Sequence, residues 1–249
     1  MKAIILAAGQ GTRLRPLTDD KPKCLVELAG KPLLEHQLAT LHAGGVDDIH
    51  VVGGYRTDQL QRPGITLHIN ERFAETNMVT TLFAAEAVMT GESDLIISYG
   101  DIVYEQRVLA ALQAVDAPIA LAVDREWRSY WAARMADPLS DAESLKLSDS
   151  DRVVELGKKP QSYDEIQGQY IGLIKIRADY VARLPQLWRS MDRDAIYDGK
   201  DYDNMFMTSF IQHLIHIGWE ARAAFIDNGW AEVDCEYDLN VATEFWRAG

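Results

Sequence analysis

Short, mostly apolar segments alternate with segments of helical periodicity through the first half of the chain, and this alternation constrains the fold more than any other feature. The segments that predict strands are residues 2–7, 48–54, 65–70, 94–101 and 118–123. The segments that predict helices are residues 32–45, 76–91 and 105–115. Apolar strands that are joined by helices are typical of a parallel sheet with helices on both of its faces.

The pattern changes after residue 124. Residues 143–157 predict a hairpin with its turn at 148–151, and residues 168–176 predict a further strand. The remaining predicted segments are helices at 180–191 and 204–217, strands at 220–226 and 230–233, and a C-terminal helix. Because no linker or repeat interrupts the chain, we expect one α/β domain over residues 1–249. We expect a mostly parallel sheet flanked by helices, with an antiparallel extension from the second half.

Charge and cysteine content narrow the classes of partner. The formal net charge of -13 argues against nucleic acid and against anionic membranes, since both need a basic face. The two cysteines, Cys24 and Cys235, form no disulfide framework. No apolar run approaches the ~20 residues of a membrane span. We therefore expect a soluble, cytoplasmic protein; the sequence does not indicate its oligomeric state.

The stretch Ile5–Leu25 joins the first predicted strand to a glycine-rich turn and then to four basic residues within eleven positions. Ligands of open α/β sheets bind at the carboxyl ends of the strands, where this turn falls. Backbone N–H groups of such a turn can cradle phosphate oxygens, and glycine allows a close approach. The stretch therefore predicts a phosphate site.

Three kinds of phosphate site compete for this stretch. A dinucleotide fingerprint, G-x-G-x-x-G, fits at Gly9 and Gly11 but has Leu14 in its third position, and prolines interrupt the helix that should follow. A P-loop sequence is missing. The third hypothesis is an extended loop in which Arg13 and Lys23 reach an oligophosphate from its two ends. The spacing A-A-G-x-G-x-R-L-x-P-L-T-x-x-x-P-K, over residues 7–23, favours it over a mere surface turn.

This spacing resembles the signature of the nucleotidyltransferases that make nucleoside-diphosphate sugars and relatives such as CDP-choline. Further segments that resemble this family are GKPLLEHQL, ISYGDIVY, VVELGKKP and WAEVDCEYDL. The resemblance covers nearly the whole chain and implies a Rossmann-like nucleotidyltransferase sheet. It implies that residues 1–124 form a nucleotide-binding half and residues 125–249 an acceptor-binding half.

The implied reaction joins a nucleoside triphosphate to a phosphorylated acceptor and releases pyrophosphate. The attacking acceptor oxygen is already an anion, so catalysis reduces to positioning and electrostatics, which a divalent metal and cationic side chains supply. By resemblance, Arg13 and Lys23 are the catalytic cations, with Arg13 on the β- and γ-phosphates and Lys23 on the α-phosphate. The resemblance implies a nucleotide site made of Leu6, Ala7, Ala8, Gly9, Gly11, Thr12, Arg13, Lys23, Thr76, Asn77 and Gly100.

Two carboxylates are the implied Mg²⁺ ligands, Asp101 at the end of a predicted strand and Asp234 in AEVD. Carboxylates suit this hard cation. Taken alone, a strand-end aspartate such as Asp101 is more often a cap or turn residue, and the surrounding motif reverses that preference. Glu232 and Asp238 lie close enough in the sequence to compete with Asp234.

The acceptor segment departs from the sugar-handling relatives, which have E-K-P where this chain has Lys158–Lys159–Pro160. Lys159 matches the lysine on the acceptor phosphate. Lys158 replaces a glutamate that holds sugar hydroxyls, and a cation cannot accept their hydrogen bonds. The departure argues against a sugar acceptor.

Other segments resemble the cytidylyltransferase branch of the family, whose acceptors are small phosphates and phosphonates. The aromatic cluster Trp127, Tyr130 and Trp131 either cages an ammonium group by cation–π attraction or packs under a loop. Arg134 or Lys158 would pair a carboxylate on the acceptor. The implied acceptor site consists of Trp131, Arg134, Lys159, Tyr170, Asp203 and Asn204.

The segments ADPLSDAESLK, YDEIQGQYIGL and MTSFIQ are most similar to those of capsule-biosynthesis enzymes that transfer CMP from CTP to L-glutamine phosphate. We therefore expect a Mg²⁺-dependent cytidylyltransferase with that acceptor. The alternatives are a phosphocholine or aminoalkylphosphonate cytidylyltransferase, a sugar-1-phosphate nucleotidyltransferase, and an inactive nucleotide-binding regulatory subunit. Retention of Arg13, Lys23, Asp101 and Asp234 argues against the last.

Overall fold

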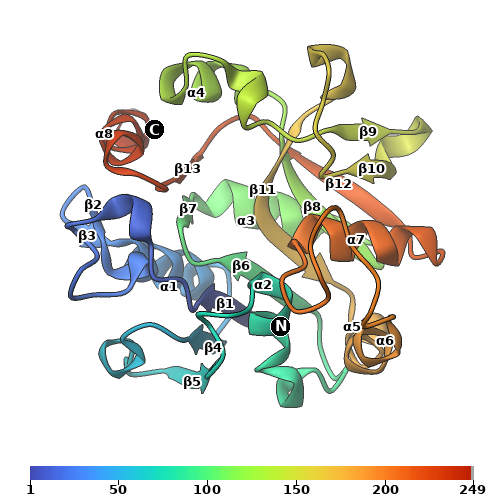
Figure 1. Cartoon of the computed structure of the whole chain (residues 1–249), viewed down its shortest axis with the longest axis horizontal. Coiled ribbons are helices and arrows are strands. Elements are labelled where there is room, and N and C mark those ends of the chain that lie inside the picture. The colour runs from blue at the N-terminus through green and yellow to red at the C-terminus, as the bar shows by residue number, and fades with distance from the viewer. Residues whose placement is uncertain (248–249) are drawn as a thin grey trace.

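A seven-stranded sheet forms the centre of the computed structural model, which describes residues 1–247, with strand order β12–β8–β11–β6–β1–β4–β5 (Figure 1). The strands of this sheet are β1 (Lys2–Ala7), β4 (Asp48–Gly53), β5 (Ile65–Ile69), β6 (Leu95–Tyr99), β8 (Ile119–Asp124), β11 (Gln169–Ile176) and β12 (Ala221–Ile226). β1 runs parallel to β4 and β6, β4 to β5, and β8 to β12. Only β11 runs antiparallel to its neighbours β6 and β8 within this sheet. The architecture confirms the predicted fold class.

Helices cover both faces of the sheet. They are α1 (Leu33–Ala43), α2 (Met78–Phe83), α3 (Gln106–Ala114), α4 (Trp127–Arg134), α5 (Ala178–Val181), α6 (Leu184–Ser190), α7 (Met207–His216) and α8 (Glu236–Arg247). Alternate residues of β1 belong to two separate cores, with Ile5 among residues of α1, α3, α4 and α8, and Ile4 among residues of α2, α6 and α7. An apolar strand of this kind is stable only when both faces are covered.

Three two-stranded sheets complete the fold. The predicted hairpin is present as β9 (Leu145–Leu147) and β10 (Val153–Leu156), and β2 (Glu27–Leu28) pairs with β3 (Lys31–Pro32). β7 (Ile102–Tyr104) pairs antiparallel with β13 (Trp230–Glu232), and the Val233 N–H donates to the Asp101 carbonyl at 3.0 Å. This last pairing brings a C-terminal segment to the end of β6.

Two differences from the predicted pattern bear on the site. First, β11 lies between β6 and β8, so the two halves of the chain interleave in one sheet, which periodicity along the sequence cannot show. Second, α4 is a helix that was not predicted. It buries the side chains of Trp127, Tyr130, Trp131 and Arg134, which have the spacing of one helical face. No helix within residues 1–247 combines the length and apolar character that a membrane span requires.

Candidate active site

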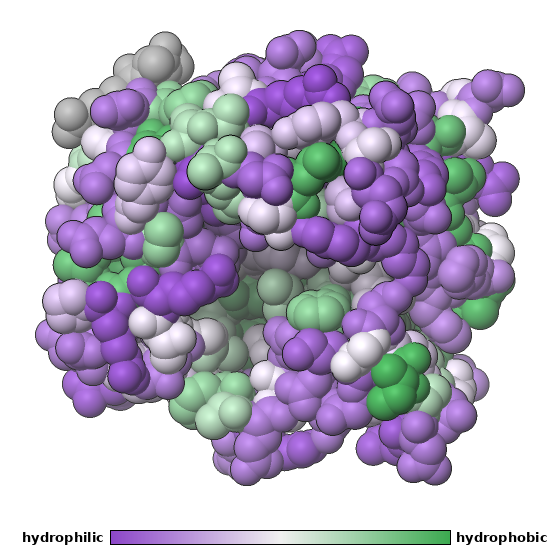
Figure 2. Space-filling model, turned by 45° about the horizontal axis from the view of Figure 1, so that its top comes forward, coloured by the Kyte–Doolittle hydropathy of each residue, from purple (hydrophilic) through white to green (hydrophobic). Residues whose placement is uncertain are grey.

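A cavity of about 310 Å³ opens at the carboxyl ends of β1 and β6. Figure 2 shows this part of the surface as a hollow with a pale to green floor and a largely hydrophilic rim. The residues that line the cavity are Leu6, Ala7, Gly9, Gly11, Thr12, Arg13, Lys23, Cys24, Asn77, Met78, Tyr99, Gly100, Asp101 and Asp234. Most of the predicted nucleotide-binding residues therefore share one cavity, at the edge of the sheet where ligands of this fold class bind.

Two glycines of the lining are required by backbone geometry. Gly11 has φ +67°, and a β-carbon there would lie 2.9 Å from the β-carbon of Lys23. Its carbonyl accepts a 2.7 Å hydrogen bond from the Thr18 hydroxyl, which fixes the loop. At Gly100 a β-carbon would lie 2.5 Å from the Leu6 carbonyl oxygen. Larger residues would displace the loop from the strand ends.

Four charged side chains from distant segments meet in this cavity. The Lys23 ammonium donates to Asp101 at 2.7 Å and also to Asp234, and Arg13 donates to Asp234 at 2.9 Å. Burial opposes the charge of Lys23, but Asp101 and Asp234 outweigh it and raise the pKa of the lysine. Although burial opposes its charge too, the pKa of Asp234 is lowered, chiefly by Lys23. Lys23 and Asp234 are therefore both ionised at neutral pH.

Three carboxylates could hold a metal ion. One oxygen from each of Asp101, Glu232 and Asp234 lies within 4.8 Å of the others. Oδ2 of Asp101 accepts from Lys23, whereas its Oδ1 is buried and has no hydrogen-bond partner among the described residues. Hard oxygen donors with one lone pair left open fit Mg²⁺, which prefers carboxylates and water.

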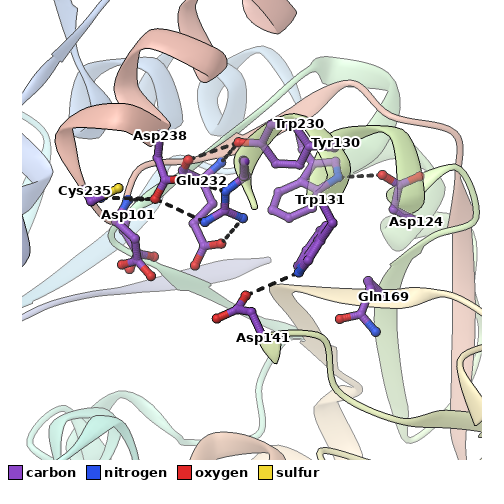
Figure 3. A network of polar contacts seen from close by, with 12 residues as sticks. Asp101, Asp124, Tyr130, Trp131, Asp141, Gln169, Trp230, Glu232, Cys235 and Asp238 are labelled. Atoms are coloured by element: carbon purple, nitrogen blue, oxygen red, sulfur yellow. Dashed lines mark hydrogen bonds and ion pairs between the residues drawn. The ribbon is translucent and has the colours of Figure 1, made fainter. Parts of the chain in front are cut away.

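Asp238 does not compete for this position. Its carboxylate pairs with Arg134 at 2.9 Å and accepts from the backbone N–H groups of Asp234 and Cys235, each at 3.1 Å (Figure 3). It orders the turn that carries Asp234. Burial raises the pKa of Glu232 to about 7, with Arg134 opposing the shift and Asp234 and Asp101 adding to it.

A second cavity, of about 190 Å³, adjoins the first and shares Met78, Tyr99 and Asp234 with it. Its other lining residues are Trp131, Asp141, Glu143, Gln169, Tyr170, Ile171, Gly172, Phe206, Met207, Thr208, Trp230 and Glu232. Hydrogen bonds hold two of its aromatic walls: Trp230 Nε1 donates to Asp124 at 2.8 Å, and Trp131 Nε1 donates to Asp141 at 3.3 Å (Figure 3). Two adjoining cavities that meet at a carboxylate cluster can hold two reactants.

A third, smaller cavity of about 100 Å³ extends from the first along α2. Ala8 and Thr76 lie here, together with Gly9 and Asn77. The Asn77 side chain accepts from the Met78 N–H at 2.8 Å and so caps α2, and its amide donates to the Asn204 carbonyl at 3.3 Å. Of the predicted acceptor residues, Trp131 and Tyr170 line the second cavity.

The structure does not bring the other four predicted acceptor residues, Arg134, Lys159, Asp203 and Asn204, into the lining of these cavities. The Asp203 carboxylate pairs with Arg72 at 2.7 Å. The Lys159 ammonium donates to the Leu139 and Ser140 carbonyls, each at 2.5 Å, and so supports the loop that carries Asp141. These contacts depend on how segments pack and have no signature in the sequence.

The placement of Arg134 corrects its predicted role as a direct ligand of an acceptor carboxylate. Its side chain is 1% exposed, and its guanidinium pairs with Glu232 at 2.8 Å and with Asp238 at 2.9 Å. A buried arginine with two carboxylate partners has no free charge to offer an acceptor. Lys158, the other predicted partner, pairs with Asp198 at the surface.

Several residues of the second cavity were not singled out from the sequence, above all Glu143, Tyr99 and Thr208. Glu143 lies in ADPLSDAESLK, which resembles the family as a segment but has three acidic residues, so nothing in it marks one carboxylate as special. For Glu232, the sequence indicates only that it could compete with Asp234 for the metal.

Residues 3–187 match the MobA-like NTP transferase domain family. The chain belongs to this family. A relative that matches over its full length is the CTP:phosphoglutamine cytidylyltransferase of Campylobacter jejuni, 43% identical over 98% of this chain and 100% of that protein. The choline-phosphate cytidylyltransferase of Streptococcus pneumoniae is 44% identical, over 33% of this chain and 38% of that protein.

A solved structure shows the same fold. The inositol-1-phosphate CTP transferase from T. maritima superimposes on this chain with a TM-score of 0.75, covering 98% of this chain and 95% of that one. The two sequences are 20% identical, so the likeness speaks to the fold alone.

Proposed function

We propose that the protein is a Mg²⁺-dependent cytidylyltransferase that transfers CMP from CTP to a small phosphorylated acceptor and releases pyrophosphate. The observation that carries the proposal is the meeting of two cavities at Asp101, Glu232 and Asp234, with Lys23 and Arg13 at the same point. The first cavity suits a nucleoside triphosphate, and the second suits the acceptor. Full-length similarity to a CTP:phosphoglutamine cytidylyltransferase supports L-glutamine phosphate as the acceptor.

The chain's own groups position two anions for in-line attack. The acceptor phosphate oxygen is already charged, so no side chain has to remove a proton. The loop around Gly11 and Thr12, with Arg13, holds the β- and γ-phosphates, and Lys23 neutralises the charge that grows on the α-phosphate. Asp101 and Asp234, with Glu232 beside them, would hold Mg²⁺, which supplies further neutralisation of phosphate charge when bound.

The ion pairs of the free site must be exchanged when substrates bind. Lys23 and Arg13 are paired with the proposed metal ligands. The carboxylates of Asp101 and Asp234 would then hold Mg²⁺, and the Lys23 ammonium and Arg13 guanidinium would pair with the substrate phosphates instead. The site is therefore neutralised both before and after binding, which limits the desolvation cost of closing it.

The base and ribose fit the strand end and the adjoining small cavity, between Leu6–Gly9 and Thr76–Asn77. In this arrangement residues 1–124 hold most of the nucleotide, and residues 125–249 supply most of the acceptor cavity and also Asp234, which lines both cavities. We place the reaction in the cytoplasm; the thiols of Cys24 and Cys235 are free, as in a reducing compartment.

Phosphocholine is the second candidate acceptor. Partial similarity to a choline-phosphate cytidylyltransferase favours it, as do the aromatic side chains of the second cavity, which suit a quaternary ammonium. Its lining includes no arginine or lysine that would pair the carboxylate of an amino acid acceptor. The two acceptors therefore have to be distinguished by experiment.

Pyrophosphate release tests the proposal directly. The purified protein is assayed with each of CTP, UTP, GTP and ATP against L-glutamine phosphate, phosphocholine, an aminoalkylphosphonate and glucose 1-phosphate, with Mg²⁺ or with EDTA. We expect turnover with CTP and L-glutamine phosphate, weaker turnover with phosphocholine, and none in EDTA. Preference for UTP with glucose 1-phosphate would overturn the assignment to the cytidylyltransferase branch. Binding of CTP without turnover of any acceptor would indicate an inactive subunit.

A further inference from the structure

The second cavity has an unusual charge balance. Four carboxylates line it, those of Asp141, Glu143, Glu232 and Asp234, and its lining contains no lysine or arginine. Three of the four have partners inside the protein: Asp141 accepts from Trp131, Glu232 pairs with Arg134, and Asp234 pairs with Lys23 and Arg13. Neither Glu143 nor Asp141 makes an ion pair with any side chain described in residues 1–246, and Asp141 has only the neutral indole of Trp131 as a donor. Glu143 is therefore a carboxylate of the cavity without a counter-charge there.

A second group in the same cavity also lacks a partner. The hydroxyl of Tyr170 is buried and makes no hydrogen bond within the described part of the chain. A buried polar atom without a partner costs free energy, so its presence in a cavity points to a ligand that completes it. The faces and edges of Trp131, Phe206 and Trp230 form the remaining walls.

We propose that Glu143 is the acceptor-selecting residue of this enzyme and binds the positively charged amino group of the acceptor in the second cavity. The inference rests on the proposed function and adds to it the subsite and the residue that select a cationic acceptor. An ammonium has three donors and no acceptor, so it complements a lone carboxylate, a free tyrosine hydroxyl and aromatic faces. A neutral sugar hydroxyl would leave the charge of Glu143 uncompensated.

The orientation of the acceptor follows from the charges. A phosphate is repelled by the carboxylates of the second cavity, whereas Lys23 and Arg13 attract it at the boundary with the first. The acceptor therefore lies with its phosphate at that boundary, beside Tyr99 and Met78, and its cationic end toward Glu143. Glu143 then acts on acceptor choice without touching CTP.

The protonation state of Glu143 in the free protein agrees with this geometry. Burial raises the pKa of Glu143 to about 7, the charges of Asp141 and Asp198 add to the shift, and a hydrogen bond with Thr208 partly offsets it. A carboxylate in this state is destabilised until a cation arrives.

The test compares two acceptors in four proteins. Wild type, Glu143→Gln, Glu143→Asp and the exposed control Glu126→Gln are assayed with CTP and either L-glutamine phosphate or its analogue in which hydrogen replaces the ammonium. We expect Glu143→Gln to raise the KM of the ammonium acceptor about 10-fold to 100-fold more than that of the analogue, and Glu143→Asp to restore part of the loss. Glu126→Gln should match wild type. Equal effects on both acceptors would overturn the proposal.

Direct binding separates this inference from the proposed function. Calorimetric titration of each protein with L-glutamine phosphate or phosphocholine, without nucleotide, reports on the subsite even if no acceptor is turned over. Weaker binding of both ligands to Glu143→Gln than to Glu126→Gln supports the subsite whatever the outcome of the pyrophosphate assay. Unchanged binding, with the variant folded by circular dichroism, would contradict it while leaving the cytidylyltransferase proposal intact.

Discussion

Lys23 and Asp101 lie 78 positions apart in the sequence, yet the lysine ammonium donates to the aspartate carboxylate at 2.7 Å. Both side chains are largely buried, at 14% and 20% exposure, and the ammonium also contacts Asp234. The ion pair therefore connects the end of the glycine-rich loop, the end of β6 and the segment after β13. This relationship links the proposed cation for the α-phosphate to the proposed metal ligands before any substrate is present.

Replacing Asp101 tests the proposed metal site. Asp101→Asn keeps the shape of the side chain but removes one charged ligand, so we expect kcat to fall on the order of 100-fold, or about 3 kcal/mol in the activation barrier. Pyrophosphate release at saturating Mg²⁺ measures the loss, and thermal unfolding checks the fold. The exposed Asp58→Asn is the matched control. Near-wild-type turnover by a folded Asp101→Asn would remove Asp101 from the metal site.

Replacing Lys23 tests whether its charge stabilises the transition state or only the bound nucleotide. If Lys23 meets charge that develops on the α-phosphate, Lys23→Ala should lower kcat far more than it raises the KM of CTP. Steady-state kinetics over a range of CTP concentrations separates the two effects. Lys21→Ala, two positions away, is the control, because Lys21 makes no ion pair with a side chain described in residues 1–246. A change in KM alone would assign Lys23 to ground-state binding.

Replacing Trp131 tests cation–π recognition of the acceptor. The indole lines the second cavity but is only 5% exposed, and the Arg134 guanidinium carbon lies 5.3 Å from the ring centroid. We expect Trp131→Leu to raise the KM of an ammonium-bearing acceptor by up to about 30-fold, from a loss of about 0.5–2 kcal/mol, and Trp131→Phe to raise it less. If both variants keep the acceptor KM of the wild type, the ring only packs.

The stability of the protein should depend on pH through Glu143. Its pKa is about 4.5 in the unfolded chain and about 7 in the folded protein, raised by burial and by Asp141 and Asp198, the latter itself paired with Lys158. Because the folded state holds the proton more tightly, a stability penalty grows as pH rises from 4.5 to 7 and is complete above 7.

The variant Glu143→Gln removes this penalty and should gain stability at alkaline pH. We expect a Tm above that of wild type by a few degrees at pH 8, from about 1–3 kcal/mol after allowance for partial exposure, and little difference at pH 5. Differential scanning calorimetry at the two pH values measures it. If the Tm of the variant is lower than that of wild type at both pH values, Glu143 supports the fold.

Replacing Arg134 tests its corrected role beneath the site. Arg134→Met leaves Glu232 and Asp238 without their buried partner, so we expect the free energy of unfolding to fall by about 3–5 kcal/mol. Urea unfolding measures the loss, with the exposed Arg128→Met as control. Wild-type stability together with a selective rise in acceptor KM would restore Arg134 as an acceptor ligand.

The elements near the start of the chain could be predicted because their signals are local. The predicted strand at 2–7 is β1, and the predicted helix at 32–45 contains α1, since apolar alternation and helical periodicity are properties of neighbouring residues. The glycine-rich loop proposed to bind phosphate was predictable for the same reason, because the glycines and cations of residues 7–23 are spaced along a single segment.

The acceptor side needed the tertiary structure, because its residues come together through long-range pairing. The insertion of β11 between β6 and β8 places Tyr170 beside Tyr99, and the pairing of β13 with β7 carries Glu232 and Asp234 to Asp101. The sequence of α4 shows a run of aromatic and basic residues, and only packing determines that Trp131 faces a cavity while Arg134 is buried between two carboxylates. Local sequence determines which segments are strands, helices and loops, whereas burial and charge pairing between distant segments decide which side chains are left free to bind a ligand.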